Sequence, residues 1–293
     1  MNDTQHKITQ GDLTVCIDEK GAELRSICYK GCEYLWQADP AYWDGQSPLL
    51  FPYVGRFTDG KYVLDGRFYE LPIHGFAKDS LFEVQEEQAN CITFLLCDSS
   101  TTRSVYPYSF QLFVTYQADN AALSVTYHVV NKSDSIMYFG IGGHPALRVP
   151  LEDGLAFEDY YLSFSKPHLP TRIGHTPSCF LSGEDHNFQL KNGTDLPLRH
   201  DLFDEDAIVL KNTADTVTLK SDSGTRSVTM CYPSLPYLGI WHMPKTDAPY
   251  VCIEPWSSLP SRQDIIEDFS CKSDLIRLPA QESYRTGWKL LLT

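Results

Sequence analysis

The stretch FQLFVTYQADNAALSVTYHVVN, residues 110–131, decides the fold. Apolar and polar residues alternate along both of its halves, and this period of two is typical of strands with one buried face. The second half divides its side chains between two faces, with Leu123, Val125, Tyr127 and Val129 on one and Ser124, Thr126 and His128 on the other. Asp119-Asn120 between the halves predicts a turn. We therefore expect a long antiparallel hairpin, in which His128 is a surface or cross-strand residue without a functional role.

Short segments of the same kind recur along the whole chain, separated by turn residues. The expected strands cover residues 13–18, 23–29, 33–36, 62–64, 67–69, 81–86, 91–97, 137–141, 160–165, 207–211, 216–220, 227–231, 237–242, 250–253 and 288–292. Asp65-Gly66 is the strongest hairpin signal among their connections. One short helix is expected near residues 261–269, and long loops over one end of the sheets at 166–201. The pattern predicts an all-β fold, a large antiparallel β-sandwich that forms a single domain over residues 1–293.

Composition narrows the classes of partner. The chain has 293 residues, 42% of them hydrophobic, and a formal net charge of -14 without any run of lysine or arginine. We therefore expect neither nucleic acid nor an anionic membrane as a partner. Nine cysteines without a C-x-x-C pair predict free thiols in a reducing, cytoplasmic setting. The sequence leaves the oligomeric state open.

Four short motifs place polar side chains among aromatic residues, glycines and prolines near the ends of expected strands. The motifs are FPYVGRF (51–57), LPIHGFA (71–77), IGGHPA (141–146) and YVCIEPW (250–256), and their polar residues are Arg56, His74, His144 and Glu254. Glycines at a strand end allow close approach of a backbone or a ligand. Proline follows both His144 and Glu254 and holds each in an extended conformation. A carboxylate in an apolar strand is costly unless it is paired, coordinating or functional, so the four residues together indicate a site.

Common cofactor and nucleophile motifs are missing from the sequence. It contains no G-x-G-x-x-G, no Walker A loop, no H-E-x-x-H and no G-x-S-x-G. Two histidines and a carboxylate are a possible metal triad, but the H-x-H pair usual in jelly-roll metalloproteins is also missing. We therefore expect no cofactor and no metal.

In their order and spacing the four motifs resemble the aldose 1-epimerase (galactose mutarotase) family, and in particular its bacterial branch of mutarotase-related proteins. The resemblance spans nearly the whole chain. It implies a galactose mutarotase-like supersandwich with a small-molecule sugar in an open cleft across one sheet. It also implies that Glu254 acts as base and His144 as acid, while Arg56 and His74 bind sugar hydroxyls. The implied reaction is the interconversion of α and β anomers of an aldohexose without a cofactor.

A further sugar-binding aspartate is implied by the family, and three consecutive acids compete for it. They are Asp204, Glu205 and Asp206. We choose Asp206 because it comes just before the apolar segment at 207–211. This region departs from the better-known mutarotases, which puts galactose in doubt as the preferred sugar.

The sequence also allows other functions. A mutarotase for hexose 6-phosphates needs a cationic pocket, for which Arg103, Arg148 and Arg262 are candidates. A carbohydrate-binding or sensing protein would keep the fold without needing both His144 and Glu254. A polysaccharide lyase or hydrolase on the same sandwich predicts two close carboxylates or a tyrosine base.

Overall fold

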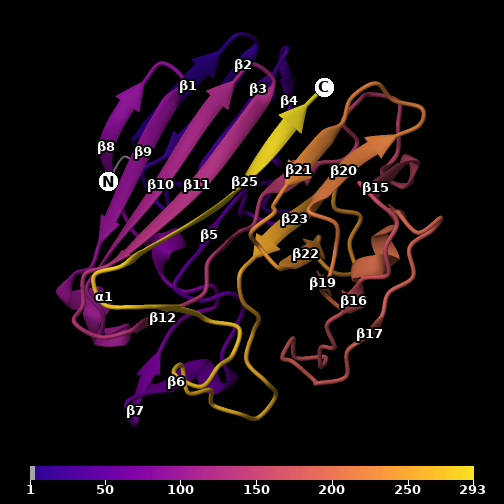
Figure 1. Ribbon diagram of the computed structural model, residues 1–293. Coiled ribbons are helices and arrows are strands. Elements are labelled where there is room, and N and C mark those ends of the chain that lie inside the picture. Colours follow the sequence, from indigo (N-terminus) through magenta and orange to yellow (C-terminus); the bar gives the residue numbers. More distant parts are fainter. Residues whose placement is uncertain (1–3) are drawn as a thin grey trace.

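The computed structural model describes residues 4–293, and strands dominate it (Figure 1). The largest sheet contains β8 (Glu83–Gln88), β9 (Cys91–Cys97), β10 (Phe110–Asp119), β11 (Ala122–Asn131), β15 (Tyr160–Phe164), β18 (Asp195–Pro197), β20 (Thr216–Ser221), β21 (Val228–Cys231) and β25 (Ser283–Leu292). Their spatial order is β18-β15-β20-β21-β25-β11-β10-β9-β8. Figure 1 shows the long strands β9, β10, β11 and β25 running side by side.

A second large sheet packs against the first, with the main hydrophobic core between them. It contains β5 (Leu49–Leu50), β13 (Gly142–Gly143), β14 (Ala146–Arg148), β16 (Thr171–Arg172), β17 (His186–Asn187), β19 (Ile208–Lys211), β22 (Tyr237–Trp241) and β23 (Tyr250–Trp256). The order is β17-β16-β19-β22-β23-β13-β5, and β14 also pairs with β23. A four-stranded sheet is formed by β1 (Gln5–Gln10), β2 (Leu13–Asp18), β3 (Leu24–Tyr29) and β4 (Cys32–Glu33).

Smaller elements complete the chain. Two-stranded pairs are formed by β6 (Lys61–Leu64) with β7 (Arg67–Glu70) and by β12 (Met137–Phe139) with β24 (Ile276–Leu278). The helical turns are α1 (Ser100–Val105), η1 (Thr58–Gly60), η2 (Ala77–Asp79), η3 (Phe157–Asp159) and η4 (His200–Phe203). The pairings between these strands are antiparallel. The predicted all-β antiparallel sandwich is therefore confirmed. None of the helices in residues 4–293 is long and apolar enough to cross a membrane.

The hairpin that opened the prediction lies at the centre of the nine-stranded sheet. Strands β10 and β11 pair along their whole lengths, and the apolar face of β11 is buried. His128 is half-buried and stacks on Phe113 directly across the hairpin, as expected for a cross-strand residue. The turn itself falls one residue later than predicted, on Asn120 and Ala121, because Asn120 adopts the left-handed conformation with φ 51°. The Asp65-Gly66 turn is confirmed, and both of its residues have positive φ.

Several boundaries differ from the prediction. The helix expected near residues 261–269 is wrong, because backbone groups there pair with distant segments: the N–H of Ser261 donates to Arg56 and the carbonyl of Glu267 accepts from Val63. Tertiary pairing overrides a weak local helix preference here. The strand expected at 250–253 continues to Trp256, so Glu254 lies inside β23 instead of at its end. The segment 166–201 is mostly loop but contributes the short strands β16, β17 and β18.

The main hydrophobic core fills the space between the sheets. Its buried side chains come from positions as far apart as Ile8 and Leu292 and include members of both large sheets. Along β23, Val251 and Ile253 belong to this core, whereas Cys252 packs with a separate cluster on the opposite face of the sheet. Glu254 shares that opposite face because side chains alternate along a strand. The sandwich thus turns one face of β23 to its core and leaves the other for a site.

Candidate active site

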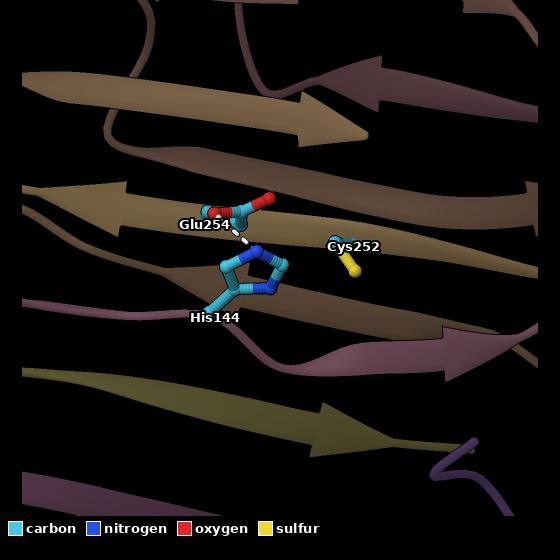
Figure 2. A group of neighbouring side chains, drawn as sticks. All are labelled: His144, Cys252 and Glu254. Carbon is cyan, nitrogen blue, oxygen red and sulfur yellow. Dashed lines mark ion pairs between the residues drawn. The ribbon is translucent and has the colours of Figure 1, made fainter. Parts of the chain in front are cut away.

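His144 and Glu254 lie opposite each other on two neighbouring segments of the same sheet. Gly142 pairs with Trp256, and Ala146 pairs with Cys252, so the same register sets position 144 against position 254. Nε2 of His144 is 3.2 Å from Oε2 of Glu254, and the two side chains point toward each other (Figure 2). Strand β23 pairs with β13, which precedes His144, and with β14, which follows it. The register of these two pairings therefore places His144 beside Glu254.

Glycines make this close approach possible. A Cβ atom at Gly142 would lie 2.9 Å from the carbonyl oxygen of Pro255, and one at Gly143 would lie 2.6 Å from Nε1 of Trp288. Both distances are shorter than real side chains allow. The glycines of the IGGHPA motif thus let a backbone and an indole come close to the segment that carries the histidine.

The open face of the sheet above this pair holds a pocket of about 670 Å³. Five sequence-predicted residues line it, namely Arg56, His74, His144, Asp206 and Glu254. They come from segments that are far apart in the sequence, and the sandwich gathers them at one place. Their roles in binding or catalysis stay predictions.

Burial dominates the electrostatics of the central pair. His144 is 8% exposed and Glu254 is 1% exposed. Burial lowers the pKa of His144 to about 4, and burial together with the charge of Asp206 raises the pKa of Glu254 well above its ordinary value. Both shifts favour the uncharged forms. A neutral imidazole beside a protonated carboxyl carries the same single transferable proton as an imidazolium beside a carboxylate.

Two atoms of the pair have unused hydrogen-bonding capacity. Among residues 4–293, Nδ1 of His144 and Oε2 of Glu254 are buried without a hydrogen-bond partner. Oε2 is within ion-pair distance of the histidine, but the geometry is not that of a hydrogen bond. Native structures seldom leave buried polar atoms unsatisfied unless they serve a function or a ligand completes them.

His74 is held in a strained turn by Gly55. Its φ is 65°, its backbone N–H donates to the carbonyl of Gly55 over 2.8 Å, and its Nδ1 accepts from the N–H of Gly55 over 3.1 Å. Since Nδ1 is an acceptor, the neutral ring carries its proton on Nε2. Burial, with His144 next in effect, lowers the pKa of His74 well below its usual range, so the ring stays neutral. Nε2–H is therefore left as a hydrogen-bond donor.

Arg56 is half-buried in the wall of the pocket. The ion pairs found among residues 4–293 do not include its guanidinium. A half-buried arginine usually has either an acidic partner or a ligand. The contacts favour the second, because a half-buried guanidinium without an acid needs another hydrogen-bond acceptor.

Among the three consecutive acids, the geometry favours Asp206. Asp206 and Glu205 line the pocket, whereas Asp204 does not. Asp206 accepts a hydrogen bond from the thiol of Cys179 and is close enough to raise the pKa of Glu254. It adopts φ 77°, which places it in a turn just before β19. Its carboxylate thus faces the same space as the central pair.

The three arginines proposed to meet a phosphate do not line this pocket, so that expectation is wrong. Arg103 pairs with Asp98, Arg262 pairs with both oxygens of Glu267, and Arg148 is exposed. Two of the three are therefore already held by neighbouring acids. The cationic residues that do line the pocket, besides Arg56, are Lys20, Arg25 and Lys78.

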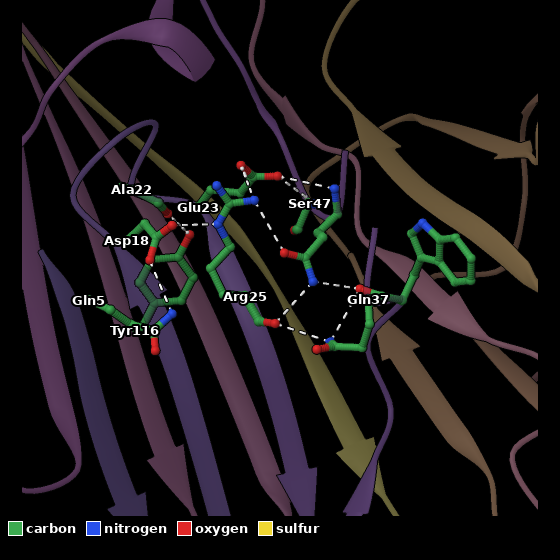
Figure 3. Close-up of polar contacts among 10 residues, drawn as sticks. Gln5, Asp18, Ala22, Glu23, Arg25, Gln37, Ser47 and Tyr116 are labelled. Carbon is green, nitrogen blue, oxygen red and sulfur yellow. Dashed lines mark hydrogen bonds and ion pairs between the residues drawn. The ribbon is translucent and has the colours of Figure 1, made fainter. Parts of the chain in front are cut away.

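Two aromatic residues of the pocket wall were missed by sequence reasoning. Trp43 and Trp241 are half-buried, line the pocket and lie 5.1 Å and 5.6 Å from the ring of His144. Figure 3 shows a polar network around Glu23 and Arg25 that connects the four-stranded sheet to Ser47, in the loop that follows Trp43. In that network Glu23 accepts from the backbone N–H groups of Gln46 and Ser47. A tryptophan in an irregular loop offers no local signal for such a role.

The protein is an all-β sandwich that carries a buried imidazole–carboxylate pair on the open face of one sheet. The chain matches the family described as "Aldose 1-epimerase" over residues 4–285, and it belongs to that family. Protein LacX (chromosomal) of Lactococcus lactis subsp. lactis is 33% identical over 270 residues, which cover 87% of this chain and 89% of that protein.

Solved structures agree with this assignment. A galactose mutarotase related enzyme from Lactobacillus acidophilus has a TM-score of 0.94 and 33% identity, covering 99% of this chain and 97% of its own. A galactose mutarotase-like protein from Lactobacillus casei has a TM-score of 0.94 and 31% identity, covering 99% and 100%. The resemblance inferred from the four motifs is therefore confirmed at the level of the family.

Proposed function

We propose that this protein is a cofactor-free aldose 1-epimerase, an isomerase that interconverts the α and β anomers of an aldohexose. One observation carries the proposal. His144 and Glu254 face each other at 3.2 Å, almost fully buried, in the wall of a pocket large enough for a sugar. A purely binding protein has no use for an acid and a base placed together.

Mutarotation needs two proton transfers in each direction. A base removes the proton of the C1 hydroxyl while an acid protonates the ring oxygen, and the ring opens to the aldehyde. Rotation about C1–C2 and closure with the roles reversed give the other anomer. The single transferable proton of the pair is sufficient for this exchange, because every proton given to the sugar is returned.

In the proposed mechanism, Glu254 exchanges a proton with the C1 hydroxyl and His144 exchanges one with the ring oxygen. Movement of the proton from Glu254 to His144 produces the carboxylate base and the imidazolium acid. Burial opposes this charge separation. Hydrogen bonds from the bound sugar offset part of that opposition, so the active protonation state forms mainly with substrate in place.

Three other residues position the sugar in this proposal. Nε2–H of His74 and the guanidinium of Arg56 donate hydrogen bonds to sugar oxygens near the ring oxygen. Asp206 accepts a hydrogen bond from a hydroxyl. Such fixed donors and acceptors orient the reacting carbon and stabilise charge while the ring opens.

The test is anomer equilibration of freshly dissolved α-glucose and α-galactose, followed by polarimetry or NMR. The wild-type protein is expected to reach equilibrium faster than the buffer, and Glu254→Gln is expected to lose that acceleration. Asp204→Asn serves as the matched control, because this neighbouring acid is exposed and does not line the pocket. If wild type and Glu254→Gln were equally inactive on a broad panel of sugars, the proposal would fail.

A hexose 6-phosphate is a second candidate substrate, favoured by the cations at the rim. Lys20 and Lys78 line the pocket. Lys78 pairs with Asp79, whereas Lys20 takes part in none of the ion pairs formed within residues 4–293. A comparison of kcat/KM for glucose and glucose 6-phosphate separates the two candidates.

A further inference from the structure

The central pair has a third neighbour that mutarotation does not require. A ring nitrogen of His144, the thiol sulfur of Cys252 and a carboxylate oxygen of Glu254 all lie within 4.8 Å of one another (Figure 2). All three side chains are buried. Cys252 and Glu254 are two positions apart on β23, so they share a face, and His144 comes from the opposing segment between β13 and β14.

This donor set suits a borderline-soft divalent ion. Imidazole nitrogen, thiolate sulfur and carboxylate oxygen are the ligands that Zn²⁺ uses, usually with tetrahedral geometry. Two ligands about 2.0–2.1 Å from a tetrahedral zinc ion are about 3.3 Å apart. Nε2 of His144 and Oε2 of Glu254 are already separated by 3.2 Å. The sulfur of Cys252 lies within 4.8 Å of the other two ligand atoms and would have to move closer to them to complete three corners.

An unsatisfied carboxylate oxygen is a second, independent observation that indicates a metal ligand. Oε2 of Glu254, whose side chain is 1% exposed, is without a hydrogen-bond partner among residues 4–293. A metal ion would satisfy that lone pair, which is otherwise expensive to bury. The pocket in front of His144 and Glu254 leaves room for a water molecule or a sugar oxygen at the fourth position.

We propose that His144, Cys252 and Glu254 form an inhibitory binding site for a single Zn²⁺ ion. Binding releases the thiol proton of Cys252, and any proton held by Glu254, to solvent. The ion then occupies a lone pair of the imidazole and an oxygen of the carboxylate. Neither group can exchange a proton with a sugar while the metal is bound. The inhibition rests on the proposed mutarotase function, whereas the metal binding does not.

Metal binding is tested directly with Co²⁺ as a spectroscopic substitute for Zn²⁺. Dialysed protein is expected to bind one Co²⁺ with a thiolate-to-cobalt charge-transfer band, and equimolar Zn²⁺ should remove the band. Cys252→Ala should lose the band, and Glu254→Gln should weaken binding by about 10-fold or more, as loss of a metal ligand typically does. Circular dichroism checks that both variants are folded.

Two other cysteines supply matched controls. Cys97 is exposed in β9 of the other large sheet and does not line the pocket, and Cys179 lines the pocket beside Asp206. The band should persist in Cys97→Ala and in Cys179→Ala. Loss of the band in Cys179→Ala with retention in Cys252→Ala overturns the proposal, and so does a failure of wild type to bind Co²⁺.

Inhibition is measured with Zn²⁺ added to the anomer equilibration assay. Wild type is expected to lose activity and to recover it with EDTA, while Mg²⁺, which prefers oxygen ligands, has no effect. In Cys252→Ala the inhibiting concentration should rise by about 10-fold or more. Zinc that binds wild type without reducing activity overturns the inhibitory role. If no sugar is turned over at all, the cobalt spectrum still decides the site, so the two proposals fail separately.

Discussion

Strands β11 and β23 lie in the two large sheets, and their contrasting environments separate structure from function. In β11 one face is buried in the core and the other is half-buried and polar. In β23 all seven residues are buried, on both faces. The face of β23 that turns away from the core carries Cys252 and Glu254 where a structural strand would place apolar side chains.

The two strands differ in how the hydrogen-bonding groups of their polar side chains are satisfied. Water and cross-strand neighbours satisfy the polar face of β11, so its alternation stabilises the fold without further requirement. Glu254 in β23 is removed from water and keeps an oxygen without a hydrogen-bond partner among residues 4–293. Burial of an unsatisfied oxygen costs folding free energy, so its presence at this position indicates a role in binding or chemistry.

The largest expected effect comes from Glu254→Gln, which keeps the shape of the side chain and removes its ability to exchange a proton. We expect kcat for anomer interconversion to fall by about 10²–10⁴-fold, the usual contribution of a general acid or base. Polarimetry over a range of sugar concentrations gives kcat and KM separately. A variant with unchanged kcat and raised KM would make Glu254 a binding group and remove the contrast with β11.

The core face of β11 gives the next largest effect, and on stability instead of activity. Leu123 is fully buried, and Leu123→Ala is expected to lower the free energy of unfolding by about 2–5 kcal/mol. Ser124→Ala, on the other face of the same strand, should change it by less than about 0.5 kcal/mol. Urea denaturation measures both. Equal effects would mean that the two faces of β11 are not as different as their burial indicates.

A smaller effect is expected in the pH dependence of stability. The folded-state pKa of Glu254 lies above its ordinary value of 4.5, so the folded protein binds the proton more tightly than the unfolded chain. Below this value both states are protonated; above it the unfolded chain ionises first, and stability falls as pH rises toward the folded-state pKa. Glu254→Gln removes that loss. The advantage of the variant over wild type should therefore grow by up to about 1.4 kcal/mol per pH unit.

Thermal denaturation of both proteins from about pH 5 to about pH 8 measures this difference. Glu83→Gln is a suitable control, since Glu83 is exposed in β8 and outside the pocket. A constant difference between Glu254→Gln and wild type across the range would show that Glu254 is ionised in the folded protein. The proposed neutral resting pair would then be wrong.

Sequence predicts well where local pattern and tertiary contact agree. The alternation in β11 and the Asp65-Gly66 turn are local properties, and both were found. The helix expected at 261–269 failed because its backbone groups pair with Val63 and Arg56, which no local pattern reveals. The pairing of position 144 with position 254 likewise depends on register between strands distant in sequence.

The candidate site shows the same division. His144, Glu254, Arg56 and His74 could be named because each stands out within an apolar motif. Trp43 and Trp241 could not, since an aromatic residue in a loop or a strand is common and only the fold brings these two beside His144. The rim cations were missed for a related reason: Lys20 and Lys78 are surface lysines until the sandwich places them at the pocket.

The smallest expected effect is at that rim, where Lys20 is exposed to solvent. If a hexose 6-phosphate is a substrate, Lys20→Gln should lower kcat/KM for glucose 6-phosphate by about 2- to 5-fold, the range for one exposed charge pair, and the loss should shrink at high salt. Activity on glucose should stay unchanged. Lys132→Gln removes the same charge away from the pocket and should affect neither sugar. Equal losses on both sugars would assign Lys20 to the general positioning of the ring, and equal losses in both variants would leave only a bulk charge effect.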